Sequence, residues 1–144
     1  MGEKDKSGRE DKEKGKRRKA KVKNQKSFMG ENDLQSRLFR FALDVIKMLR
    51  TLKGGADLKV ISNQLIKAAT SSGANYEEAQ AAVSRTDFGY KISISLKEMR
   101  ESNYWLRLLG DLYKQNSEIV RLIKESIELK NILGSISVKV SPRN

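Results

Sequence analysis

The chain has 144 residues, enough for one domain, and its 30 Lys and Arg against 18 Asp and Glu give a formal net charge of +12, which favours polyanionic partners such as RNA, DNA or an anionic membrane surface. The sequence contains no Cys and no His, which excludes disulfides, Ser-His-Asp triads and zinc sites built on these ligands. It has no apolar leader and no run of about 18 apolar residues, so we expect neither a signal peptide nor a membrane span, and a cytoplasmic location.

The first 30 residues are mostly Lys, Glu, Asp, Gly and Arg. Apolar residues are too few there to offset the entropy lost on ordering, so the composition predicts a disordered basic tail over residues 1–30. We take six of its cations as candidate contacts to nucleic-acid phosphates: Lys16, Arg17, Arg18, Lys19, Lys21 and Lys23. The alternative is a tail that only improves solubility.

Four segments with helical spacing of apolar residues follow the tail. The first begins after Asn32 and Asp33 and ends at the pair Gly54-Gly55. We expect the second to be capped by Asp57, the third by Ser84 in an S-x-x-D pattern, and the fourth to begin near Asn116 or Ser117. Short connections between them predict an all-α, up-down-up-down four-helix bundle over residues 31–136, followed by a frayed C-terminal end over residues 137–144.

Basic residues recur on one side of the third predicted helix. At about 100° per residue they fall within an arc of about 100°: Lys97, Arg100, Arg107 and Lys114. A shorter set on the first helix contains Arg37, Arg40 and Lys47. Either set could bind phosphates, although a solvated polar face is the more common explanation.

We also expect a polar layer between the second and third helices. A turn near residues 83–86 would place Asn75 beside Glu98 and Ser72 beside Glu101, with Glu78 in the same layer. Without His, the Glu98-x-x-Glu101 pair does not complete the usual di-iron set, so we expect no metal, no cofactor and no catalysis. Base stacking by Tyr104-Trp105 is an alternative to the packing role that we favour for both aromatic residues.

Residues 36–136 carry a family resemblance. The matching residues include Ser62-Asn-Gln-Leu65, Ser71-Ser-Gly-Ala-Asn75, Asp87-Phe88, Leu96-Lys-Glu98, Tyr104-Trp-Leu106 and Ile132-Leu-Gly-Ser-Ile136. In these residues the chain resembles the four helix bundle protein family, whose founding members are called 23S ribosomal RNA intervening-sequence proteins. The resemblance implies a homo-oligomer, with a pentamer as the expected ring. It also implies a role as the accessory protein of a reverse transcriptase, as in diversity-generating retroelements.

The sequence therefore leads to two hypotheses. The first is a non-enzymatic basic helical scaffold that binds RNA or DNA, in keeping with the net charge of +12. The second is a homo-oligomeric protein-interaction module without direct nucleic-acid binding. Salt-dependent binding to RNA would separate them, because phosphate neutralisation makes affinity fall as salt rises.

Overall fold

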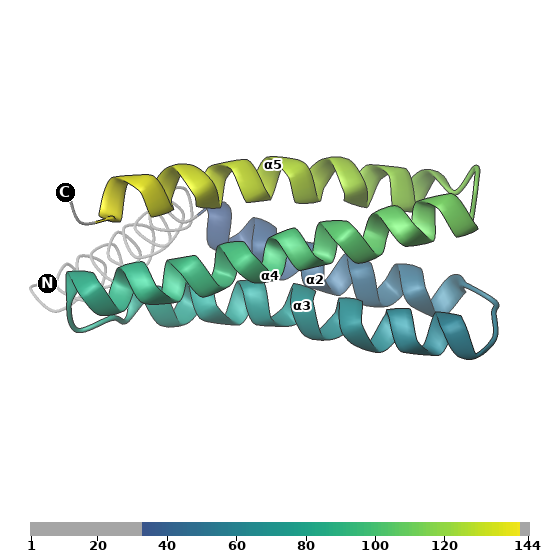
Figure 1. Cartoon of the computed structure of the whole chain (residues 1–144), viewed down its shortest axis with the longest axis horizontal. Coiled ribbons are helices and arrows are strands. Elements are labelled where there is room, and N and C mark those ends of the chain that lie inside the picture. Colours follow the sequence, from purple (N-terminus) through teal and green to yellow (C-terminus); the bar gives the residue numbers. More distant parts are fainter. Residues whose placement is uncertain (1–32, 142–144) are drawn as a thin grey trace, which may run out of the picture. The chain divides into compact units, whose positions relative to one another are not determined.

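The computed structural model describes residues 33–141, and within this range four α-helices follow one another. They are α2 (Asp33–Thr51), α3 (Ala56–Gln80), α4 (Arg85–Leu112) and α5 (Ser117–Val140). Successive helices run antiparallel, with α4 between α3 and α5 and with α2 behind them (Figure 1). This arrangement confirms the predicted up-down-up-down four-helix bundle.

Local capping fixes where two of the helices begin. Ser84 precedes α4, and its side chain accepts a hydrogen bond from the backbone N–H of Asp87, as the S-x-x-D pattern predicts. Asn116 does the same for the N–H of Ile119 at the start of α5. The predicted cap at Asp57 is wrong, because α3 begins at Ala56, and Gly55, two residues before Asp57, takes the cap position without a side-chain hydrogen bond.

The C-terminal helix is longer than the sequence predicted. We placed the end of the bundle at Ile136 and a frayed segment after it, whereas α5 continues to Val140. The prediction relied on Pro142, the only proline of the chain, and the β-branched Val138 and Val140 also lower helix propensity. Val140 approaches the start of α4, because a Cβ added at Gly89 would lie 3.5 Å from a Val140 methyl carbon. Packing therefore outweighs the local preference.

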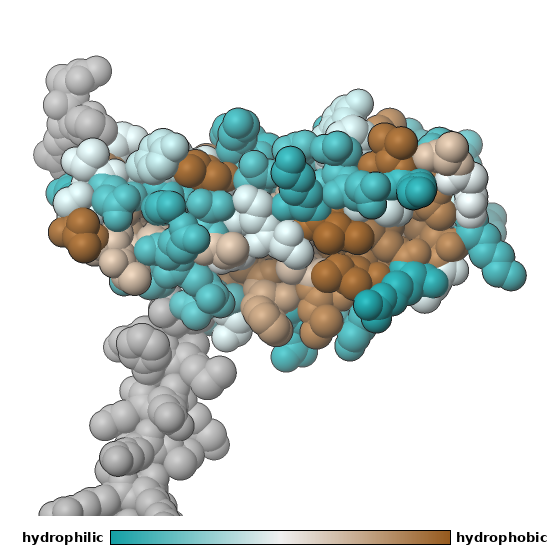
Figure 2. Space-filling view, turned by 90° about the horizontal axis from the view of Figure 1, so that it is seen from below, coloured by the Kyte–Doolittle hydropathy of each residue, from teal (hydrophilic) through white to brown (hydrophobic). Residues whose placement is uncertain are grey.

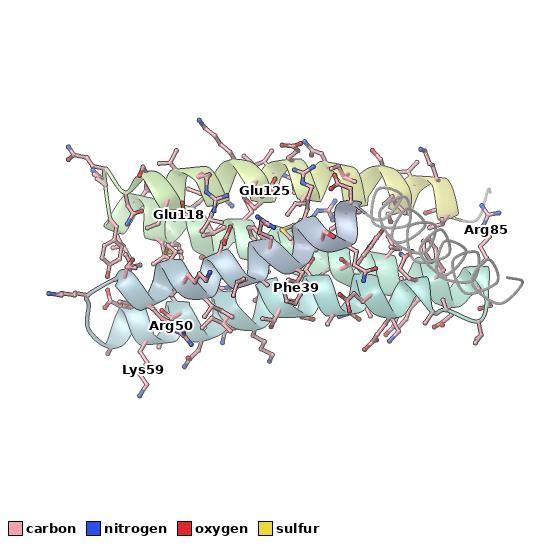
Figure 3. The ribbon with its side chains drawn as sticks, turned by 180° about the vertical axis from the view of Figure 1, so that it is seen from behind. Phe39, Arg50, Lys59, Arg85, Glu118 and Glu125 are labelled. Carbon is pink, nitrogen blue, oxygen red and sulfur yellow. The ribbon has the colours of Figure 1, made fainter. Side chains whose placement is uncertain are left out.

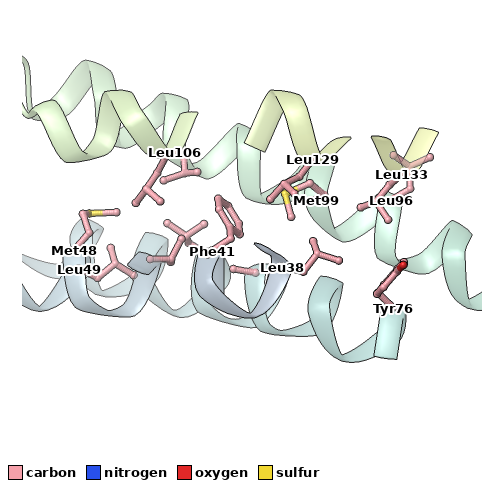
Figure 4. Close-up of a cluster of buried hydrophobic side chains, with 14 of the residues drawn as sticks. Leu38, Phe41, Met48, Leu49, Tyr76, Leu96, Met99, Leu106, Leu129 and Leu133 are labelled. Atoms are coloured by element: carbon pink, nitrogen blue, oxygen red, sulfur yellow. The ribbon is translucent and has the colours of Figure 1, made fainter. Parts of the chain in front are cut away.

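The core follows the apolar spacing of each helix. Fully buried side chains recur three, four or seven residues apart and belong to one core cluster, part of which is shown in Figure 4. They are Leu38, Phe41 and Val45 from α2, Leu65 from α3, Ile92, Met99 and Leu106 from α4, and Leu122, Leu129 and Leu133 from α5. At about 0.8 kcal/mol per buried CH₂ group, such side chains supply the main stabilisation of a bundle of this kind.

Two buried serines join α3 to α4. The Ser72 hydroxyl donates to the backbone carbonyl of Ser95 at 2.8 Å, and the Ser95 hydroxyl donates to the carbonyl of Ser72 at 2.7 Å. Each side chain thus reaches the main chain of the opposite helix, which requires the two backbones to approach closely. Small neighbours on α3, such as Ala68, Ala69 and Ala79, are buried on the same helix and permit this approach.

Candidate nucleic-acid interface

The cations predicted on the third helix lie together on the outer side of α4. Lys97, Arg100 and Arg107 are all exposed and belong to this helix. Lys114 is also exposed but follows the end of the helix at Leu112. Its direction therefore does not follow from the helical periodicity used to predict it. We call Lys97, Arg100, Arg107 and Lys114 the basic row.

The inner face of α4 fixes the direction of the basic row. Ile92, Met99 and Leu106 are fully buried on the same helix. Asn103 adds a polar anchor, because its side-chain N–H donates to the Ser126 hydroxyl on α5 at 2.9 Å. The core thus holds α4 in one rotational setting, and residues out of phase with the core point outward.

Ion pairing separates the basic row from three other cations of the bundle. Arg37, Lys91 and Arg121 each form ion pairs with carboxylates. Within residues 33–141, none of the ion pairs includes a member of the basic row. Asp111 lies among these cations and is exposed, and it lowers the local positive charge without forming an ion pair. The cations of the basic row therefore remain available to an external anion.

Arg107 is nevertheless held in place by neutral groups. Its Nε donates to the Asn103 side-chain oxygen at 3.0 Å, and Asn103 is in turn bonded to Ser126. Its guanidinium carbon lies 5.9 Å from the centre of the Tyr104 ring, within cation–π range. These contacts orient the guanidinium without neutralising its charge.

The two adjacent aromatic residues have different environments. Trp105 is partly buried, packs against the core and donates from Nε1 to a Glu101 carboxylate oxygen at 3.3 Å. Tyr104 has 47% of its surface exposed, and its ring meets Trp105 edge-on, with the centroids 5.0 Å apart. The packing role predicted for both residues therefore holds for Trp105, whereas Tyr104 lies largely at the surface beside the basic row.

The second predicted basic set, on α2, is partly neutralised. Arg37 bridges two carboxylates of α5, Glu125 and Glu128, and its bond to Glu125 is the largest factor that raises its pKa. Glu125 projects from α5 beside α2 (Figure 3). Arg40 and Lys47 stay exposed, but Arg37 holds two helices together and is a poor candidate for phosphate binding.

The predicted polar layer has a different composition. Ser72 bonds Ser95 and not Glu101. Asn75 donates to the carbonyl of Ser71 in its own helix at 2.8 Å and not to Glu98. The turn occupies residues 81–84 and not 83–86, which accounts for four of the six residues by which the register of α3 and α4 differs from the predicted one.

The predicted carboxylates lie apart from that layer. Glu78 is exposed and forms an ion pair with Lys91 at 2.7 Å. Burial, together with the nearby Glu101 carboxylate, raises the pKa of Glu98. In residues 33–141 no group of three or more acidic side chains is arranged to hold a metal ion. The six predicted tail cations, from Lys16 to Lys23, lie outside the described residues.

A separate apolar groove of about 360 Å³ lies between α2 and α3. Its lining includes Phe39, Leu43 and Ile46 from α2 and Gly73 and Ala74 from α3. Phe39 is 66% exposed and Leu43 is 41% exposed. Apolar side chains gather on the face of the bundle seen in Figure 2, and Phe39 marks the groove on α2 in Figure 3. Exposed apolar patches of this kind often mark interaction surfaces.

The fold and its surfaces define a class: a basic four-helix bundle with an unpaired cationic row and a separate apolar groove. Within the described range, none of the helices is both long enough and apolar enough to cross a membrane. Residues 31–135 match the family described as 23S rRNA-intervening sequence protein. The chain belongs to this family.

A solved structure supports the assignment. The bundle is similar, with a TM-score of 0.64 and 31% sequence identity, to the crystal structure of a protein with unknown function from the S23 ribosomal protein family of Bacteroides thetaiotaomicron VPI-5482. The similarity covers 72% of this chain and 97% of that one. A comparison with curated proteins finds no match.

Proposed function

We propose that the protein is a non-enzymatic helical scaffold that binds RNA or DNA through the basic row. The observation that carries the proposal is that Lys97, Arg100 and Arg107 are exposed on one helix without a carboxylate partner in an ion pair. Such cations displace the counterions of a phosphate backbone when they bind, and this release provides most of the affinity in non-specific binding. The net charge of +12 adds long-range attraction.

The salt dependence of binding tests this proposal. Each phosphate contact on a single strand contributes a slope of about −0.7 to the plot of log affinity against log salt. The double variant Arg100→Gln/Arg107→Gln should therefore bind RNA more weakly and reduce the slope by about 1.4. Deletion of residues 1–26 should weaken binding further if the tail cations also contact phosphates.

Arg50→Gln/Lys59→Gln is a matched control, because it removes the same charge from α2 and α3. Both residues are exposed, and Lys59 points away from the bundle in Figure 3. This control variant should lower the affinity for RNA only slightly, because it reduces the net charge of the protein without removing a cation of the basic row. Equal binding by wild type and the Arg100/Arg107 variant, with and without the tail, would rule out the nucleic-acid role. An accessory role beside a reverse transcriptase remains a prediction from the resemblance, and a cytoplasmic location remains a prediction from the sequence.

A second proposal concerns assembly. We infer that the groove between α2 and α3 is a contact surface between copies of this chain. Phe39 and Leu43 line this groove and stay exposed, so the core of a single copy does not cover their apolar surface. Leu112, at the end of α4, is another exposed apolar residue. Repeated head-to-tail contacts close into a ring, and the resemblance makes a pentamer the expected one.

Light scattering tests the assembly. Wild type should be oligomeric at micromolar concentration, and Phe39→Ser/Leu43→Ser should shift it towards the monomer. Val83→Ser is the control, since Val83 is 95% exposed and lies outside the groove. A wild-type protein that remains monomeric would exclude the ring.

A further inference from the structure

Tyr104 lies within the basic row. It stands four residues after Arg100 and three residues before Arg107, so that the three side chains follow one another along the same side of α4. About 15 Å of helix separate Lys97 from Arg107 at the usual rise per residue. The row therefore presents cations on both sides of an aromatic ring.

The Tyr104 ring is held while much of it stays accessible. The edge of Trp105 packs against it at 74° between the ring planes, and Trp105 is itself packed against the core and bonded to Glu101. Arg107 lies three residues after Tyr104 and approaches the same ring. Its side chain is held by a hydrogen bond to Asn103. With these contacts in place, 47% of Tyr104 remains exposed. A ring that is already ordered loses little entropy when a ligand stacks on it.

We propose that Tyr104 is a stacking platform for an unpaired base and that the basic row therefore binds single-stranded nucleic acid in preference to a duplex. This inference rests on the proposed function of the same row. Arg100 and Arg107 would neutralise the phosphates on either side of the stacked base. The bases of a duplex are already stacked and paired, so a duplex offers the row its phosphates but no free base for Tyr104.

The experiment compares three probes of about 12 nucleotides, a length within the usual range of about 4–16 per binding site. They are oligouridylate, oligothymidylate and a mixed-sequence duplex, all at the same salt concentration. Trp105 is the only tryptophan of the chain, and its ring touches Tyr104, so its fluorescence reports events at that ring. At least one single strand should bind more tightly than the duplex and quench Trp105, whereas the duplex should not quench it.

The Tyr104 variants separate stacking from charge. Tyr104→Leu should weaken single-strand binding roughly tenfold, with duplex affinity and the salt slope unchanged. Tyr104→Phe should bind as wild type does, because a phenyl ring also stacks. Tyr90→Leu is the matched control, since Tyr90 is an exposed tyrosine of the same helix, 62% accessible and outside the row. Thermal melting of each variant verifies that it is folded.

The possible failures are distinct. If Tyr104→Leu binds every probe as wild type does while Arg100→Gln/Arg107→Gln loses affinity, the stacking platform is wrong and the proposed function stands. Equal affinity of wild type for single strands and duplex also overturns the platform. If no probe binds, both proposals fail. The two single strands differ in the 2′-hydroxyl and in the 5-methyl group of thymine, and either strand supports the platform when its binding depends on Tyr104.

Discussion

The paired serines make a strong prediction about the stability of the bundle. Ser72 and Ser95 are fully buried, and each hydroxyl donates to the backbone carbonyl of the other residue. Ser72→Ala removes one of these bonds, which should lower the free energy of unfolding by about 1 kcal/mol. Ser72→Val also forces two methyl groups between close backbones, and overpacking adds about 1–3 kcal/mol.

Thermal unfolding followed by circular dichroism measures these effects. In a domain of this size, 1 kcal/mol corresponds to a change in Tm of about 4 °C. We therefore expect Tm to fall by about 4 °C for Ser72→Ala and by about 8–16 °C for Ser72→Val. Ser93→Ala is the matched control, because Ser93 is exposed on α4 and its hydroxyl bonds only Tyr90 of its own helix. The control corrects for the greater helix propensity of alanine.

The result for Ser72→Val decides whether the reasoning is right. If this variant unfolds at the wild-type temperature, the two backbones do not approach closely at Ser72, and the packing of α3 on α4 is different. A loss in Ser93→Ala as large as that in Ser72→Ala would show that the helix itself, and not the interhelical bond, determines the effect.

Three further changes test other contacts. Burial raises the pKa of Glu98, so the folded state holds the proton of this carboxyl group more tightly than the unfolded state does, and ionisation at higher pH lowers stability. Glu98→Gln should therefore melt at a higher temperature than wild type at pH 7. The difference should disappear below about pH 4, the pKa of a glutamate in the unfolded chain. Arg37→Met should cost about 1 kcal/mol in urea unfolding and less in high salt, whereas the exposed Arg40→Met should cost little. Tyr113→Phe removes the bond from its hydroxyl to the Lys53 carbonyl, 2.8 Å long, and should lower stability by about 0.5–1.5 kcal/mol by the same assay.

Features that depend on neighbouring residues in the chain could be predicted from the sequence. The buried series Leu38, Phe41 and Val45 follows from apolar spacing within one helix. The caps at Ser84 and Asn116 follow from side chains that bond an N–H three residues later. Both signals lie within a few residues, so no knowledge of the rest of the fold is needed to read them.

The pairing between helices could not be predicted with the same accuracy. In an antiparallel pair, each residue by which the turn is misplaced shifts the opposite residue by two. Ser72 was expected to face Glu101 and instead bonds Ser95, six residues earlier. The turn lies two residues before the predicted position, which accounts for four of these six residues. A sequence signal was available, since Ser95 and Ser126 occupy core positions of the apolar spacing and are fully buried.

The candidate site was predicted in part for a related reason. Spacing alone places Lys97, Arg100 and Arg107 on one side of a helix, and it does the same for Arg37, Arg40 and Lys47. The difference between the two sets is the pairing of Arg37 with Glu125, which lies 88 residues away in the sequence. Long-range ion pairs cannot be read from local spacing, and the exposure of Tyr104 beside a buried Trp105 likewise depends on how α4 is rotated.

The positions of the two proposed surfaces lead to a last prediction. The groove is lined by α2 and α3, whereas Lys97, Arg100 and Arg107 lie on α4, so an assembly whose contacts spare this side of α4 would leave the three cations uncovered. An assembly would then present several rows to one nucleic-acid chain, and linked sites can raise the overall affinity by about 10²–10⁴. Phe39→Ser/Leu43→Ser should therefore weaken binding to a long RNA although it changes no cation. Its binding to a short oligonucleotide that spans one row should stay as in wild type. Equal loss on short and long RNA would show that the groove contributes to the binding site itself, and no loss on either would show that the rows act independently.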